Sequence, residues 1–219
     1  MRFDLPPVTL ALLIANVAIF LLMSMGLGDW LLVHAALWPF GPQRLVGYTA
    51  AGAPVTIGFH WWQLLTYAFM HGGWMHIGFN MLALYMFGGP IEHLLGTRHF
   101  LFYYLFCAVI AAVAHLAVVH FFTGGFYPTV GASGAIFGLL LAFGMMYPQA
   151  RIIALILPIP MPAWIAVIGY MLLELFLGVT GTQAGVAHFA HLGGAVGGFF
   201  LIQYWRGKFP IRPKRILMR

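Results

Sequence analysis

Charged residues are scarce in this chain of 219 residues. They make up 6% of the sequence, whereas 63% is hydrophobic and the mean hydropathy is +0.95. A soluble domain carries about a quarter charged residues, so these few charges cannot cover a water-facing surface. The composition therefore excludes an ordinary soluble domain and indicates that lipid is the solvent.

Acidic residues and cysteine are also rare. Four Asp and Glu stand against ten Lys and Arg, a formal net charge of +6. Six of the ten basic residues lie in the final stretch, "RGKFPIRPKRILMR", which indicates contact with anionic lipid headgroups and argues against a nucleic-acid partner. The single cysteine, Cys107, lies in an apolar run and excludes an internal disulfide.

Long apolar runs are abundant, and six of them are candidate membrane helices. A span needs about 20 apolar residues. The first run lacks a small-x-small cleavage site at its end, so we interpret it as a helix and not as a signal peptide. The six expected spans are Val8–Met25, Trp74–Leu95, His99–Phe122, Ala132–Tyr147, Ala163–Val179 and Val186–Tyr204. Without a linker or an internal repeat, residues 1–219 are expected to form a single domain.

The basic residues predict the orientation of these spans. Arg2, Arg98, Arg151 and the tail of about residues 205–219 fall on one side of a six-span chain, and only Arg44 falls on the other. The positive-inside rule makes the first side cytoplasmic. We therefore expect both termini in the cytoplasm. A short chain with few charges beyond its tail also fits the plasma membrane of a bacterium.

Two connections between the expected spans are unusual. The first outside loop, about residues 26–73, is rich in Trp, Phe and Leu but broken by Gly and Pro, which suits the membrane interface. The second contains Pro158, Pro160 and Pro162, and prolines at alternate positions forbid a continuous helix. We expect an extended cytoplasmic hairpin before the fifth span.

Polar residues within the spans form two clusters. In "HGGWMHIGFN", His76 and Asn80 share one helix face, one turn apart, and His71 precedes them. Such a pair also serves as interhelical hydrogen-bonding glue. In "AHFAHLGGAVGG", His188 and His191 lie at the outer start of the sixth span. This second pair fits satisfied interfacial histidines, or ligands of a metal or haem.

Paired glycines connect the second cluster with "GASGAIFG". Gly134 and Gly138 form a G-x-x-x-G pattern, as do Gly194 and Gly198, and small residues four apart let helix backbones approach closely. If the two glycine faces meet, Ser133 and the histidine that precedes Gly194 by three residues come to the same depth.

A serine beside a histidine suggests nucleophilic chemistry. A serine hydroxyl becomes a nucleophile when a base takes its proton, and His191 is the candidate base for Ser133. Acyl transfer also needs donors for the oxyanion, which the Ser133 N–H, His76 and Asn80 could supply. Glu174 lies near the outer end of the fifth span, but no motif positions it, so we expect a Ser–His dyad.

These motifs together resemble the rhomboid intramembrane serine proteases. The resemblance covers nearly the whole chain: six helices, a long first outside loop, and "HGGWMHIGFN", "GASGAIFG" and "AHFAHLGGAVGG" in order on the second, fourth and sixth helices. It implies an all-α, rhomboid-like bundle without a cofactor that cleaves transmembrane segments of other proteins through an acyl-enzyme intermediate. The active site would open to the outer side.

The resemblance also implies roles for individual residues. The dyad is carried by Ser133 and His191. The residues with expected binding or supporting roles are His71, His76, Asn80, Gly131 and Phe137, in addition to the paired glycines. Glu92 is expected to be structural and His188 a neighbour of the site. One departure is that Trp62 is followed by Gln63 and not by Arg, which puts the anchoring of the first loop in doubt.

Two other functions compete with a protease. A catalytically silent relative would bind transmembrane clients, but its signature is the loss of the serine or histidine, and both are present. A metal or haem protein would use His71, His76, His188 and His191, but it would not explain Ser133 or Asn80.

Overall fold

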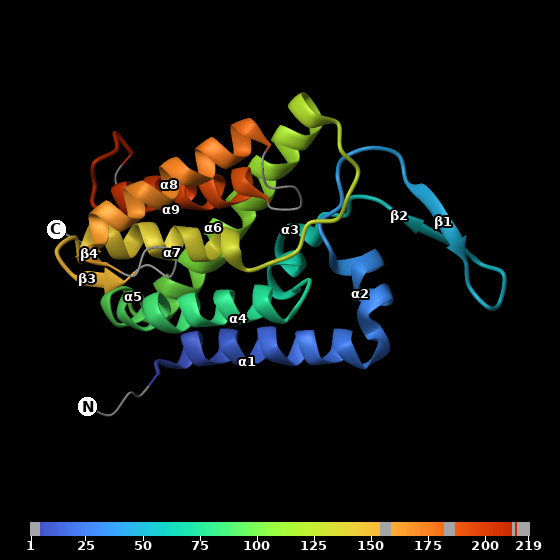
Figure 1. Cartoon of the computed structure of the whole chain (residues 1–219), viewed down its shortest axis with the longest axis horizontal. Helices are drawn as coiled ribbons and strands as arrows, with labels where there is room; N and C mark the ends of the chain where they lie inside the picture. Colours follow the sequence, from blue (N-terminus) through green and yellow to red (C-terminus); the bar gives the residue numbers. More distant parts are fainter. Residues whose placement is uncertain (1–4, 154–158, 182–186, 212, 214–219) are drawn as a thin grey trace.

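A computed structural model describes residues 5–153, 159–181, 187–211 and 213 (Figure 1). The helical segments follow the six expected spans. Helix α1 (Pro7–Leu22) is followed by η1 (Met23–Leu27), in which the chain kinks at Gly26 (φ +107°), and then by α2 (Gly28–Ala35). The second span is the run of α4 (Trp74–Ala83), η3 (Leu84–Gly88) and α5 (Gly89–Leu95). The remaining spans are α6 (Thr97–Val118) with η4 (Val119–Thr123), α7 (Ser133–Met146), α8 (Ala163–Thr180) and α9 (His188–Trp205).

Three of the six expected spans have both the length and the apolarity to cross a membrane. They are the helical segments Pro7–Ala35, which is kinked at Gly26, Thr97–Thr123 and Ala163–Thr180. Helix α7 is apolar but has only 14 residues. The run from Trp74 to Leu95 carries two histidines, an asparagine and a glutamate, and α9 carries two histidines and a glutamine. The start of the sixth span at Val186 lies outside the described residues.

Helix α9 lies between α6 and α7, with backbones in close contact. A Cβ on Gly194 would overlap the carbonyl of Gly134, and one on Gly193 would overlap Ala114 of α6. The Tyr103 hydroxyl on α6 donates a hydrogen bond of 2.8 Å to the Gly138 carbonyl on α7. Because lipid gives helices little hydrophobic drive to associate, such close contacts and hydrogen bonds stabilise the bundle.

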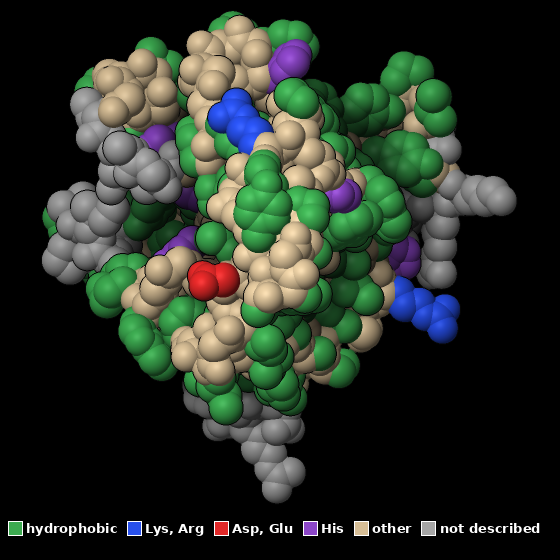
Figure 2. Space-filling model, turned by 90° about the vertical axis from the view of Figure 1, so that its right-hand side faces the viewer, with side chains coloured by type: hydrophobic (Ala, Val, Ile, Leu, Met, Phe, Trp, Pro, Cys, Tyr) green, Lys and Arg blue, Asp and Glu red, His purple; other side chains and the backbone are tan. Residues whose placement is uncertain are grey.

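The first connection folds into structure of its own. It contains α2, the antiparallel strands β1 (Arg44–Tyr48) and β2 (Pro54–Ile57), α3 (Gln63–Thr66) and the 3₁₀ turn η2 (Tyr67–Phe69). The two strands extend away from the helices (Figure 1). Figure 2 views the molecule from this end, and charged side chains are sparse there among many hydrophobic ones. The place of this loop at the membrane interface stays a prediction.

Gln63 anchors this connection. Its side chain is fully buried; Oε1 accepts hydrogen bonds from the N–H groups of Trp38 (3.2 Å) and His60 (3.1 Å), and Nε2 donates to the carbonyl of Gly58 (3.1 Å). The amide therefore ties three points of the loop together, at the position where the resemblance led us to look for an arginine.

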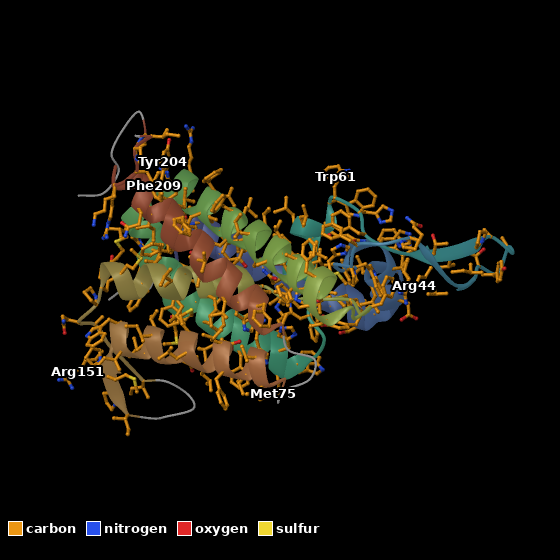
Figure 3. The ribbon with its side chains drawn as sticks, turned by 90° about the horizontal axis from the view of Figure 1, so that it is seen from above. Arg44, Trp61, Met75, Arg151, Tyr204 and Phe209 are labelled. Atoms are coloured by element: carbon orange, nitrogen blue, oxygen red, sulfur yellow. The ribbon has the colours of Figure 1, made fainter. Side chains whose placement is uncertain are left out.

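The proline-containing segment forms an extended hairpin in its described part, as predicted. Strands β3 (Arg151–Ile153) and β4 (Pro160–Pro162) pair antiparallel immediately before α8, and Pro158 lies outside the described residues. Figure 3 shows Arg151 at one end of the bundle, with Arg44 and Trp61 at the opposite end. Arg151 and Arg44 thus lie at opposite ends of the bundle, and the orientation in the membrane stays a prediction.

Glu92 has the structural role expected for it. Its carboxylate, on α5, accepts hydrogen bonds from the N–H of Val8 (3.0 Å) and from both the N–H (2.7 Å) and the hydroxyl (2.8 Å) of Thr9. These groups lie in the first turn of α1, where backbone N–H groups have no partner within the helix. A buried carboxylate there also suits the positive end of the helix dipole.

Candidate active site

The site is centred on a hydrogen bond between two helices. Ser133 begins α7, and its Oγ lies 2.7 Å from Nε2 of His191, in the first turn of α9. The contact follows from the glycine packing, because Gly134, next to the serine, faces Gly194, nearly one turn after the histidine. A larger residue at Gly194 would push the serine and the imidazole apart.

Phe137 fixes the plane of the imidazole. Its ring lies one turn after Ser133 and stacks on His191 with a centroid separation of 4.3 Å and an interplanar angle of 3°. The stacked His191 ring can still rotate within its own plane, and the hydrogen bonds of its two nitrogens restrict that rotation.

Gly131 and His76 face each other beside the serine. Gly131 has φ +131°, and a Cβ there would lie 2.7 Å from Nε2 of His76 and 3.6 Å from the Ser133 hydroxyl. The Gly72 N–H donates to Nδ1 of His76 at 3.4 Å, which leaves the ring proton on Nε2. His76 therefore presents an N–H donor beside Ser133.

Asn80 supplies a second donor. It lies one turn after His76 on α4, is 6% exposed, and lines the same cavity as Ser133. Its Nδ2 has no hydrogen-bond partner among the described residues. A buried amide without a partner is costly, so this N–H₂ group is free to bind an oxygen atom that enters the cavity.

His71 lies behind His76. Its ring meets that of His76 edge to face at 5.0 Å, and neither of its nitrogens has a hydrogen-bond partner in the described part of the chain. Burial, followed by the charge of His76, lowers the pKa of His71 to about 4, so its ring is neutral at pH 7. His71 supports His76 and does not reach Ser133.

Glu174 is the site residue that sequence reasoning did not place. From α8, its Oε2 accepts hydrogen bonds from Nδ1 of His191 (2.9 Å) and Nδ1 of His188 (2.6 Å). The sequence signal was Gly178, one turn later on the same face of α8: a Cβ there would lie 3.1 Å from the Cβ of His188. A small residue one turn from a membrane carboxylate marks a face in close contact with another helix.

Glu174, His188 and His191 also form the group of possible metal ligands found among the described residues. One ligand atom from each of Glu174, His188 and His191 lies within 4.8 Å of the others, whereas His71 and His76 do not belong to the group. Both Nδ1 atoms already bond to the carboxylate. The four-histidine set considered for a metal protein therefore does not gather.

A largely apolar cavity of about 330 Å³ begins at Ser133. It lies between α4 with η3, α7, α8 and strand β3, and its lining includes Asn80, Phe137, Tyr170 and Ile153. The cavity thus reaches from the serine to the hairpin at the other end of α7. Most of the side chains that line it are apolar.

Comparison with known proteins agrees with the geometry. A family model described as "Rhomboid domain" matches residues 58–207, which include all the residues of the site. The chain belongs to the rhomboid family. The bundle and its apolar helices are those of an integral membrane rhomboid protein.

Three relatives illustrate the range of this rhomboid's similarities. "Rhomboid protein 1, mitochondrial" of Saccharomyces cerevisiae is 34% identical over 146 residues, 60% of this chain and 38% of the relative. "Rhomboid protease GluP" of Bacillus subtilis is 30% identical over 161 residues, which are 72% of this chain and 29% of the relative. "Rhomboid protease GlpG" of Klebsiella pneumoniae is 29% identical over 140 residues, which are 64% of this chain and 44% of the relative. The chain thus spans less than half the length of these curated relatives, two of which are named as proteases.

Proposed function

We propose that this rhomboid is an intramembrane serine endopeptidase that cleaves transmembrane segments of other membrane proteins. The observation that carries the proposal is the 2.7 Å hydrogen bond between Ser133 Oγ and His191 Nε2, with unengaged donors beside it. A neutral imidazole that accepts the serine proton makes the hydroxyl a nucleophile.

The reaction begins when Ser133 Oγ attacks the carbonyl carbon of a substrate peptide bond. The serine proton moves to Nε2 of His191, and the carbonyl π electrons move to its oxygen to give a tetrahedral oxyanion. The N–H groups of His76, Asn80 and Ser133 itself surround the position of this oxygen, and the start of α7 contributes the positive end of a helix dipole. Gly131 leaves room for the oxygen at this point.

The intermediate collapses when the carbon–nitrogen bond breaks. His191 returns its proton to the leaving amine, which leaves an acyl ester on Ser133. A water molecule then gives a proton to Nε2 as its oxygen attacks the ester, and His191 returns this proton to the serine oxygen. The products are two peptides, and the enzyme is restored without a cofactor.

The cavity between α4 and α8 supplies a path for the substrate from the bilayer. A helix hides its carbonyl groups in its own hydrogen bonds, so a substrate must unwind before it is cut. Glycine and other helix-breaking residues reduce that cost by about 1 kcal/mol or more each. We therefore propose substrates with such residues near the outer face of a bacterial plasma membrane, with α8 as the wall that moves.

Labelling with a fluorophosphonate tests the nucleophile without a known substrate. The full-length protein in detergent or in liposomes is expected to react at one serine, and Ser133→Ala and His191→Ala are expected to lose the label. Equal labelling of Ser133→Ala and the wild type would contradict the proposal. Metal analysis of the same samples excludes or detects an ion at Glu174, His188 and His191.

Cross-linking tests the movable wall. Ala83 on α4 and Tyr170 on α8 line the same cavity, and Cys107 is fully buried, so cysteines introduced at the first two positions can be linked selectively. The link is expected to block cleavage of a membrane-embedded peptide while fluorophosphonate labelling persists. Cleavage at an unchanged rate would exclude α8 as the gate.

A further inference from the structure

We propose that Glu174 is the positioning carboxylate of His191, so that Ser133, His191 and Glu174 act as a connected chain in which His188 holds the carboxylate. This inference rests on the proposed function. It replaces the expected dyad by a three-residue arrangement whose third member comes from α8.

The hydrogen bonds fix the proton on one nitrogen of His191. An ionised carboxylate only accepts hydrogen bonds, so the ring nitrogens that contact Glu174 Oε2, Nδ1 of His191 at 2.9 Å and Nδ1 of His188 at 2.6 Å, must both carry protons. A neutral His191 then has its lone pair on Nε2, 2.7 Å from the serine hydroxyl. This is the tautomer that can take the serine proton.

The same carboxylate stabilises the charge that develops during the reaction. When the serine proton moves to Nε2, His191 becomes an imidazolium, with Glu174 in contact with its other nitrogen. The carboxylate stays ionised and takes up no proton. Because the group is buried, this pair interacts more strongly than it would in water.

Packing does not account for a carboxylate at this position. Glu174 is 8% exposed, and it lies on a helix that is long and apolar enough to cross a membrane. An ionisable side chain is costly in such a helix. The other buried carboxylate in the described chain, Glu92, is explained by the start of α1. The hydrogen bonds described for Glu174 go to the two histidines of α9 instead.

Gly178 allows the carboxylate to reach its partners. It lies one turn after Glu174, and a Cβ there would come within 3.1 Å of His188 and 3.2 Å of the ring of Phe189. The end of α8 and the start of α9 therefore approach closely at the level of the site. This approach sets the register between Glu174 and His191.

The decisive variant is Glu174→Gln, measured by the second-order rate of fluorophosphonate labelling. The amide has the shape of the carboxylate but can donate a hydrogen bond to Nδ1 of His191, which would move the ring proton to Nε2, and it has no charge. We expect the rate to fall by up to about 10⁴-fold, the loss that follows when the carboxylate of a Ser-His-Asp triad is neutralised. The midpoint of the pH–rate profile is expected to move to lower pH, because the imidazolium loses its partner.

Two further variants distinguish the positioning of His191 from an effect on the stability of the protein. Glu174→Asp keeps the charge with a shorter reach, so it is expected to recover part of the rate and the wild-type pH midpoint. Glu92→Gln is the matched control: it removes another buried carboxylate and is expected to lower the unfolding temperature without moving the pH profile. If Glu174→Gln does not fold, the comparison of Glu174→Asp with the wild type still tests the proposal.

The outcomes distinguish this inference from the proposed function. Labelling of the wild type but not of Ser133→Ala, with a slow and pH-shifted Glu174→Gln, supports both. Labelling of Glu174→Gln at the wild-type rate and pH midpoint overturns the positioning role alone. A pH shift of the same size in Glu92→Gln also overturns it. Labelling that persists in Ser133→Ala overturns the proposed function.

Discussion

Gly194→Ala tests whether helix packing sets the distance between nucleophile and base. The new Cβ would overlap the Gly134 carbonyl oxygen and lie 2.7 Å from its carbon, whereas ordinary contacts begin at 3.4 Å. Contact with the carbon alone requires helices α7 and α9 to separate by about 0.7 Å, and contact with the oxygen requires more. Since Gly134 adjoins Ser133, this shift lengthens the 2.7 Å bond to His191 to at least about 3.4 Å, outside the range of about 2.6–3.2 Å over which a general base takes a proton.

The expected result is a loss of about 10²-fold in the rate of fluorophosphonate labelling, the size that follows a misplacement of about 1 Å. Overpacking of this kind costs about 1–3 kcal/mol of stability, so the unfolding temperature of the variant is measured beside its labelling rate. The loss of rate must persist at temperatures where the variant remains folded.

The matched control is Gly169→Ala. This glycine lies on α8, and a Cβ there would meet nothing within 4 Å. Alanine is expected to leave the labelling rate within about twofold and to favour the helix by up to about 1 kcal/mol. A wild-type rate in Gly194→Ala, or an equal loss in both variants, would refute the argument from packing.

Three other variants probe the remaining parts of the site. Gly131→Ala is expected to reduce labelling by about tenfold or more, because its Cβ would lie 2.7 Å from His76 Nε2 at a φ of +131°; a normal rate would show that the loop adapts. Asn80→Ala is expected to lower kcat for cleavage of a transmembrane peptide by about 10²-fold with little change in KM; a change in KM alone would assign Asn80 to substrate binding. Because burial lowers the pKa of His71 from 6.5 to about 4, the unfolded chain takes up this proton first, so stability is retained above pH 6.5 and about 3 kcal/mol is lost as the pH falls to 4. His71→Leu is expected to reduce the acid-induced fall in unfolding temperature between pH 7 and pH 4, and an equal fall in both proteins would contradict this role.

The sequence predicts the helical ranges well because apolar periodicity and runs act within one segment. The expected range from Trp74 to Leu95 coincides with the run of α4, η3 and α5, and the prolines predict the extended hairpin. The strands β1 and β2 were not predicted, because the first connection contains aromatic, glycine and proline residues without the alternation of polar and apolar residues that indicates a strand. The π-helical turns η3 and η4 within the long helices likewise have no signal in the apolar pattern, whereas the kink in η1 falls at Gly26, where the first outside loop was expected to begin.

The site was predictable where its residues lie on one helix or beside a glycine pattern. Ser133 and His191 could be paired because each precedes a G-x-x-x-G pattern. Two such patterns predict that the backbones of their helices approach closely, which brings the residues beside them together. Glu174 could not be placed in this way, because its partners depend on how α8 is rotated about its own axis against α9. That rotation is a tertiary property, and Gly178 alone indicates it in the sequence.

Helix α8 connects substrate access with the orientation of the base. Tyr170 lines the cavity that begins at Ser133, and Glu174, one turn later on the same helix, bonds to His191. A helix is stiff over one turn because its backbone is hydrogen-bonded at every residue. An outward movement of α8 large enough to admit a substrate segment therefore also withdraws the carboxylate from His191, and the base regains its orientation only when α8 returns.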